Sequence, residues 1–127
     1  MSGIIAYTEG LADLLNDELV TRSALINKAR ATNNIRQASG PGILVSPAAR
    51  RDEFTLDGGY QATVSVYCIA AGALGDLTDA KVLDELADVV LEVIPAVSLV
   101  EPVALQVPTH EAPKAALRCE FTVEVTP

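Results

Sequence analysis

Apolar and polar residues alternate through the middle of the chain, over residues 60–71 (YQATVSVYCIAA). Side chains of a β-strand point alternately to the two faces of its sheet, so this pattern predicts a half-buried strand with one apolar face. The β-branched and aromatic residues of the stretch favour the same structure. At about 3.3 Å per residue, this strand would cross the whole of a domain of this length, and we expect the other elements to pack around it.

The beginning of the chain has a pattern typical of an amphipathic helix. Over residues 8–20, leucines recur every four positions and acidic residues occupy the opposite side. Thr8 is the expected N-cap, because its hydroxyl can accept a hydrogen bond from a free N–H of the first turn. The pattern also allows the helix to continue through residues 23–31, so its C-terminal end is left open.

A second helix is expected to begin at Asp76 or Thr78, both of which are suitable N-caps. It should end near Ile94, because Pro95 cannot continue it. Its apolar stripe consists of Val82, Leu83, Leu86, Ala87, Val89, Val90, Val93 and Ile94. The opposite side carries a row of acidic residues, Asp84, Asp88 and Glu92. Like charges at this spacing repel each other, which destabilises the helix slightly. Three roles for the row are open: a solvated face, a contact with basic residues of another chain, or the lining of a channel.

Short segments connect the first helix to the long strand. Residues 32–42 are polar and contain glycine and proline, which predicts a loop. Residues 43–46 predict a brief strand, and the prolines on both sides favour a sheet edge or a strand end. Residues 48–53 are charged and should be exposed. Residues 54–56 are either a short strand or the end of a hairpin loop before an Asp-Gly-Gly turn.

The end of the chain predicts an antiparallel hairpin. Residues 103–107 and 117–125 alternate between apolar and polar positions, and a proline-containing loop separates them. The order α-β-β-α-β-β predicts a single α+β domain over residues 1–127. We expect a four- to five-stranded, mostly antiparallel sheet with two helices packed on one face. The other face of the sheet should be polar and able to contact another subunit.

Composition and charge narrow the classes of function. The chain has 127 residues, half of them hydrophobic, which suits one globular domain. Its net charge of −8 argues against general affinity for nucleic acid or anionic membranes. No apolar segment approaches the roughly 18 residues needed to span a bilayer. The N-terminal residues lack the features of a signal peptide, so synthesis in the cytoplasm is expected.

The sequence has no recognisable catalytic or metal-binding motif. The single histidine, His110, is followed by Glu111 but not by a second histidine at the HExxH spacing, and no nucleophile elbow or phosphate-binding loop occurs. Cys68 and Cys119 fall on apolar strand faces. We expect them to be either buried free thiols or a disulfide between neighbouring strands. We expect no enzyme activity, with no catalytic residues, no metal and no cofactor.

Several stretches, in their order along the chain, resemble one known family. They are an opening helix (LADLLNDELV), a short strand after glycine and proline (GPGILVSP), the long strand (YQATVSVYCIAA), a helix (DAKVLDELADVVLEVI) and two closing strands (VALQV and LRCEFTVEV). This arrangement is similar to the tail terminator proteins of long-tailed, siphovirus-like bacteriophages. The likeness covers most of the chain but rests on element order rather than on a motif, so no site residue is transferred. Related neck and tail-completion proteins share much of this layout.

The resemblance implies a structural virion protein of the tail or neck, assembled in the host cytoplasm without a membrane. Such proteins form a homo-oligomeric ring, typically a hexamer, that caps the tail tube, ends its polymerisation and docks onto the connector or stopper protein of the head. DNA passes through the ring without sequence-specific binding. The alternatives are another neck, head–tail connector or tail-completion protein, or a small cytoplasmic ligand-binding or regulatory module, which would need an apolar pocket with convergent polar groups.

The distribution of charge is a separate reason to expect a ring. Between Arg22 and Arg51 the chain has six basic residues and no acidic one, whereas residues 76–92 contain six acids and one lysine. Oppositely charged segments make copies complementary in a head-to-tail manner, and such contacts close into rings when the rotation fits. Our candidate interface residues are Arg36, Arg50 and Arg51 on one side and Asp84, Asp88 and Glu92 on the other.

Overall fold

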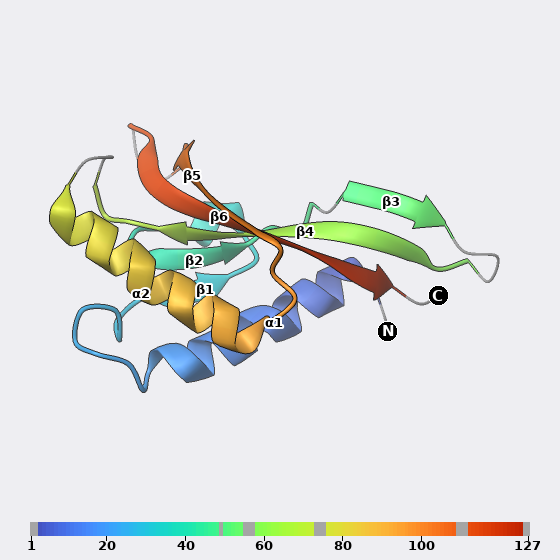
Figure 1. Ribbon diagram of the computed structural model, residues 1–127, viewed down its shortest axis with the longest axis horizontal. Coiled ribbons are helices and arrows are strands. Elements are labelled where there is room, and N and C mark those ends of the chain that lie inside the picture. The colour runs from blue at the N-terminus through green and yellow to red at the C-terminus, as the bar shows by residue number, and fades with distance from the viewer. Residues whose placement is uncertain (1–2, 49, 55–57, 73–75, 109–111, 126–127) are drawn as a thin grey trace.

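The structure is a computed structural model that describes residues 3–48, 50–54, 58–72, 76–108 and 112–125. Its elements are α1 (Ile4–Leu19), β1 (Arg30–Thr32), the 3₁₀ turn η1 (Ile35–Gln37), β2 (Gly42–Val45), β3 (Arg50–Phe54), β4 (Tyr60–Ile69), α2 (Leu77–Val93), β5 (Leu99–Leu105) and β6 (Lys114–Val125) (Figure 1). Two helices and one mixed sheet make this an α+β fold, as the sequence predicts.

The sheet has six strands, more than the four or five expected. Their order is β1-β2-β4-β6-β5, and β3 pairs with the first half of β4. The long strand β4 is central: β6 pairs with it along its full length, from Tyr60 opposite Val125 to Ile69 opposite Ala116. All pairs are antiparallel except β1 with β2. The predicted closing hairpin is confirmed as β5 and β6.

The segment between α1 and β2 contributes a strand to the sheet. β1 covers the last residues of the possible helix extension and the first residue of the predicted loop, and it pairs in parallel with β2, opposite the side on which β2 pairs with β4. Of the two placements that the prolines favour, the sheet edge is therefore wrong and the strand end is confirmed. Pro41 and Pro47 fall just outside the paired residues Gly42–Val45, so neither removes an N–H from the hydrogen-bonded ladder.

The charged segment before β4 is also part of the sheet. Arg50–Phe54 forms β3, with an irregularity in its register between Arg51 and Glu53. Strand pairing uses backbone groups, so exposed charged side chains do not prevent it, and Arg50 and Arg51 remain exposed as predicted. The turn that follows has a positive φ of 88° at Gly58. Phe54 ends β3, and residues 55–57, which include the rest of the predicted short strand or loop, lie outside the described residues.

Helix α1 begins and ends earlier than the pattern suggests. It starts at Ile4 after Gly3, so Thr8 is not its N-cap. Thr8 is buried inside the helix, and its hydroxyl donates a hydrogen bond of 2.9 Å to the Ile5 carbonyl. The helix does not continue through residues 23–31, because that segment turns back and buries Ile26 and Ala29 in the core.

Helix α2 matches the prediction closely. Of the two expected N-caps, Asp76 is the one used: its carboxylate accepts a hydrogen bond of 3.1 Å from the Asp79 amide. The helix ends at Val93, just before Pro95. All eight residues of the predicted stripe are buried or half-buried.

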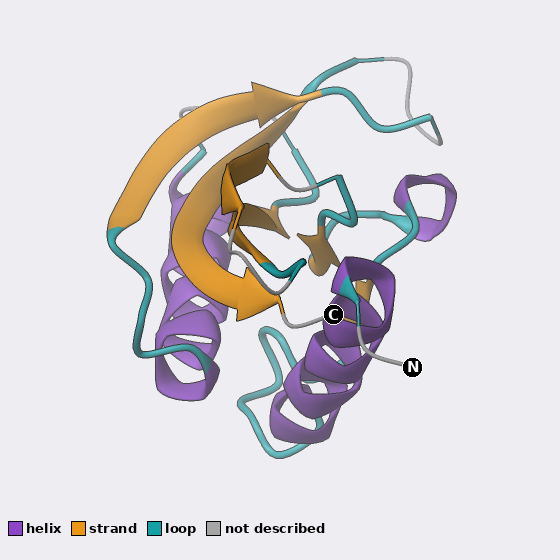
Figure 2. Ribbon diagram, turned by 90° about the vertical axis from the view of Figure 1, so that its right-hand side faces the viewer, coloured by secondary structure: helices purple, strands orange, loops and turns teal. Residues whose placement is uncertain are grey.

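Both helices lie on the same side of the sheet (Figure 2). The core between them is formed by α1, α2 and the inner faces of β2, β4 and β6, with Leu15, Leu19, Val66, Leu86, Val90 and Cys119 fully buried.

The outer face of the sheet is only partly polar. Arg118 forms ion pairs there with Glu101 at 2.8 Å and Glu120 at 3.2 Å. Leu44 and Ile69 lie on the same face. Leu44 is paired with Tyr67, and Tyr67 and Ile69 are two positions apart on β4, so their side chains point to the same side of the sheet. They form a second small apolar cluster with Ala38 and Val107. The expectation of a polar outer face is therefore met around Arg118 but not around Leu44 and Ile69.

Candidate functional site

An open apolar groove of about 530 Å³ lies between the first half of α1 and the end of α2. The two helices leave part of the inner sheet face uncovered at this point. The groove is lined by Ala6, Tyr7, Gly10, Leu11, Leu14, Val93, Ile94, Pro95, Ala96, Phe121 and Val123. Among these side chains only the Tyr7 hydroxyl is polar, and partial burial raises its pKa. Tyr7 is 39 % and Leu14 57 % exposed, which is high for side chains of this size.

One end of the groove is acidic. An adjoining hollow, lined by Asp17, Glu18 and Glu92, shares Leu14 and Val93 with the groove. An apolar surface with carboxylates at one end suits a protein segment that carries apolar and basic side chains together.

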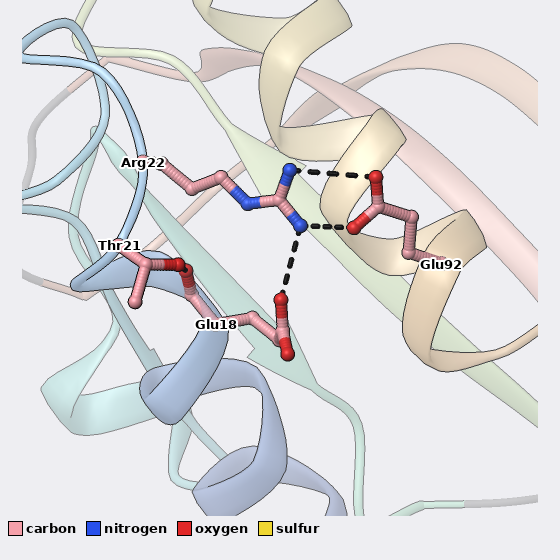
Figure 3. A network of polar contacts seen from close by, with 4 residues as sticks. All are labelled: Glu18, Thr21, Arg22 and Glu92. Carbon is pink, nitrogen blue, oxygen red and sulfur yellow. Dashed lines mark hydrogen bonds and ion pairs between the residues drawn. The ribbon is translucent and has the colours of Figure 1, made fainter.

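Arg22 links the two helices at this acidic end (Figure 3). Its guanidinium donates to both carboxylate oxygens of Glu92 on α2, and to Glu18 on α1 at 3.1 Å. These hydrogen bonds, above all the one to Glu92, raise the pKa of Arg22, and the same contact lowers the pKa of Glu92. A second link runs from the Ser23 hydroxyl to the Glu85 carboxylate at 3.1 Å.

The predicted acidic residues lie together on α2. Asp84, Asp88 and Glu92 are all exposed, but Glu92 is bound by an arginine of its own chain. Sequence reasoning missed Arg22 as its partner, because the two residues are 70 positions apart. Only the excess of basic residues after α1 could have suggested such a pair.

The predicted basic residues are exposed on other elements. Arg36 lies in η1, and Arg50 and Arg51 lie in β3. The Arg51 guanidinium is 4.5 Å from the centre of the Tyr60 ring, and Arg50 donates to the Thr63 hydroxyl at 3.4 Å. Among the described residues, no ion pair joins these three arginines to Asp84, Asp88 or Glu92.

A second open hollow, of about 520 Å³, lies beside η1 on the outer face of the sheet. It is mainly apolar, with Ile5, Ile35, Leu44, Tyr67 and Leu105 in its lining. Three of its four polar side chains already bind the protein: Asn33 donates to Thr8, Asn34 accepts from the Arg36 amide, and Ser46 donates to Ala48. The fourth is the single hydroxyl of Tyr67. Neither hollow therefore has the convergent, available polar groups typical of a small-molecule site.

The two cysteines are free and buried, which settles the choice between thiols and a disulfide. The hydrogen bond with Cys119 and burial raise the pKa of the Cys68 thiol, so this thiol stays protonated and is a poor nucleophile.

Within the parts of the chain that the structure describes, no three His, Cys, Asp or Glu side chains are grouped as a metal site would require. His110 and Glu111 lie outside those parts. No helix among the described residues has the length and apolar character needed to cross a membrane.

Comparison of the chain with protein-family models finds no matching family, and comparison with curated protein sequences finds no matching relative. The function is therefore argued from the surfaces described above and from the resemblance in element order.

Proposed function

We propose that this chain is a tail terminator protein of a siphovirus-like phage. Its copies form a ring, a hexamer by resemblance, that caps the tail tube, ends tube polymerisation and joins the tail to the connector or stopper protein of the head. Genome DNA passes through the ring without sequence-specific binding. The protein belongs to the virion tail or neck, assembles in the host cytoplasm, and acts without catalysis, cofactor or membrane.

The observation that carries the proposal is the open apolar groove with its acidic end. Large apolar side chains exposed side by side favour contact with another protein. A small-molecule site would enclose most of its ligand and direct polar groups at it, whereas the only polar side chain in the groove is Tyr7. A subunit that must bind copies of itself, a tube and a connector needs several such surfaces.

The charge layout supports a head-to-tail contact between copies. Asp84 and Asp88 are exposed on α2 and belong to a row of like charges, which basic residues of a neighbour would stabilise. Arg50 and Arg51, exposed on β3, are the proposed partners for these two residues. Arg36 is the proposed partner at the Glu92 end of the row, where Arg22 already neutralises part of the negative charge.

Three alternatives stand beside this proposal. In the first, the acidic row lines the channel, where negative charge would keep DNA from binding; the same carboxylates cannot fully serve both this role and the contact between copies. Another neck, connector or tail-completion protein would use similar surfaces with different neighbours. The ligand-binding alternative is disfavoured, because three of the four polar side chains of the second hollow are already bound within the chain.

The test is co-expression with the tail tube protein encoded in the same genome, followed by electron microscopy. We expect tubes that carry a ring of this protein at one end and that stop growing once the ring is bound. Tubes of unlimited length with no added density at either end would overturn the proposal, and rings found only elsewhere in the neck would favour the connector alternative.

A further inference from the structure

We infer that the groove between α1 and α2 binds the η1 turn of a neighbouring copy, with Ile35 in the groove and Arg36 at its acidic end. The inference rests on the proposed ring and identifies one contact that closes it. The contact would be head-to-tail, because the two surfaces are different parts of the chain.

Charge selects η1 among the exposed apolar groups of the chain. Outside the groove, the exposed large apolar residues in the described part of the chain are Ile5, Val20, Leu25, Ile35, Leu77, Leu91, Leu99 and Val100. Ile5 belongs to α1, which carries four acidic residues and no basic one. Leu77 and Leu91 belong to the acidic helix α2, and Leu99 and Val100 adjoin Glu101 on β5. A like-charged surface would be repelled by the acidic end of the groove.

Two basic regions with exposed apolar residues remain. Val20 and Leu25 flank the turn whose Arg22 and Ser23 already bind acidic residues of α2. Ile35 is different: it is 43 % exposed beside the exposed Arg36, within a segment that has no acidic residue from Thr21 to Arg51. It therefore offers an apolar and a basic side chain next to each other, which is what the groove and its acidic end can accommodate.

The η1 turn is held in place by its own hydrogen bonds. The Asn34 carboxamide accepts from the Arg36 amide at 3.0 Å, and the Thr32 hydroxyl accepts from the Asn34 amide at 3.1 Å. Ala38, at the end of the turn, is buried in the second apolar cluster. A turn that is already ordered loses little conformational freedom when it binds, so even a small contact can be favourable.

The geometry prevents a chain from filling its own groove. The groove lies on the side of α1 that faces α2, whereas the segment leading into η1 lies against another side of the helix, where Asn33 donates to Thr8 at 3.3 Å. Figure 2 shows the short helical turn η1 at the periphery, with α1 between it and α2. The occupant must therefore come from another copy, and each copy offers one groove and one turn.

The experiment uses three variants at exposed positions, so that folding is preserved. Leu14→Asp places a charge in the groove, Ile35→Asp places one on the turn, and Leu99→Asp is the matched control, because Leu99 is 41 % exposed but belongs to neither surface. Assembly is measured by native mass spectrometry and by counting capped tube ends in the co-expression system. We expect ring formation and capping to fall about tenfold or more in the first two variants and to remain at the wild-type level in the third.

A mixture of the first two variants tests the head-to-tail geometry. The intact turn of the Leu14→Asp chain can still bind the intact groove of the Ile35→Asp chain, so we expect one-to-one pairs that do not grow into rings. Wild-type-like rings in either single variant, or a mixture that forms no pairs, would overturn this contact while leaving the ring itself intact. A wild-type chain that forms neither rings nor caps would instead overturn the proposed function.

Discussion

At the scale of single residues, Arg22 has the clearest structural role. It follows the last turn of α1 and binds Glu92 near the end of α2, so it connects two helices that otherwise leave the groove open between them. Because Arg22 also binds Glu18, one guanidinium neutralises two carboxylates in a chain that carries a net charge of −8. The acidic end of the groove is therefore less negative than the sequence alone suggests.

We expect Glu92→Gln to lower the thermal unfolding midpoint at pH 7 and to lower it less at a pH below the ordinary glutamate pKa of about 4.3. Arg22 lowers the pKa of Glu92 in the folded state. The stabilisation is thus fully present above the ordinary glutamate pKa of about 4.3 and is lost as pH falls through the lower folded-state value. Thermal denaturation of both proteins at the two pH values measures the difference.

The matched control is Asp88→Asn, one turn earlier on the same exposed helix face. Removing this charge relieves repulsion within the acidic row, so the variant should be as stable as the wild type or slightly more stable at pH 7. Equal destabilisation by both substitutions would show that the contact of Glu92 with Arg22 does not stabilise the folded protein more than any other carboxylate on this helix face does.

Two glycines should respond in opposite ways to alanine. A Cβ atom at Gly40 would lie 1.9 Å from the Ala70 carbonyl oxygen, which is backbone and cannot move aside easily, so Gly40→Ala should destabilise the fold by about 1–3 kcal/mol. At Gly10, inside α1, a Cβ atom would have no heavy atom within 4 Å. Gly10→Ala should therefore stabilise the protein by about 0.5–1 kcal/mol. Urea denaturation measures both, and equal effects would contradict the close packing at Gly40.

At the scale of elements, α2 depends on its N-cap. Asp76→Ala removes the carboxylate that accepts from the Asp79 amide and should cost about 1 kcal/mol. Thr78→Ala alters the other candidate cap, which lies inside the helix and is exposed, so its effect should be well below that of Asp76→Ala. Urea denaturation of the two variants compares their stabilities. A larger loss of stability in Thr78→Ala than in Asp76→Ala would contradict the assignment of Asp76 as the N-cap.

The strand β1 shows how an element can depend on distant residues. It is three residues long and would not be stable alone. Its central residue, Ala31, is held by the Asn16 side chain of α1, which accepts from the Ala31 amide at 2.7 Å and donates to its carbonyl at 2.9 Å. β1 therefore forms because α1 and β2 lie on either side of it, which no local pattern indicates.

At the scale of the whole molecule, charge reversal on α2 tests how copies recognise each other. The double variant Asp84→Lys/Asp88→Lys should weaken assembly if these exposed carboxylates meet Arg50 and Arg51 of a neighbour. The effect should be strongest at low salt, because salt screens exposed charges. Light scattering across a range of salt concentrations measures assembly.

Glu124→Lys serves as the control, because Glu124 is exposed on β6 and lies away from α2. If the double variant assembles as the wild type does, the proposed pairing of Asp84 and Asp88 with Arg50 and Arg51 is ruled out. The acidic row would then be a solvated face or the lining of a channel.

The periodicity of the sequence determined the two helices, the central strand, the closing hairpin and the α+β class. These features depend on local spacing: residues 82–94 form one stripe of a helix, and residues 60–69 alternate between two faces, whatever lies elsewhere in the chain. The sequence also placed Asp84, Asp88 and Glu92 in one exposed row, because four-residue spacing aligns side chains on a helix.

Tertiary structure alone decided which distant segments meet. The parallel pairing of β1 with β2 and the contact of Arg22 with Glu92 both join residues that no local sequence pattern relates to each other. The groove has the same origin, since it exists only where α1 and the end of α2 leave Val123 partly uncovered. Surfaces of this kind depend on how whole elements pack against one another, whereas the pattern of residues along the chain predicts each element separately.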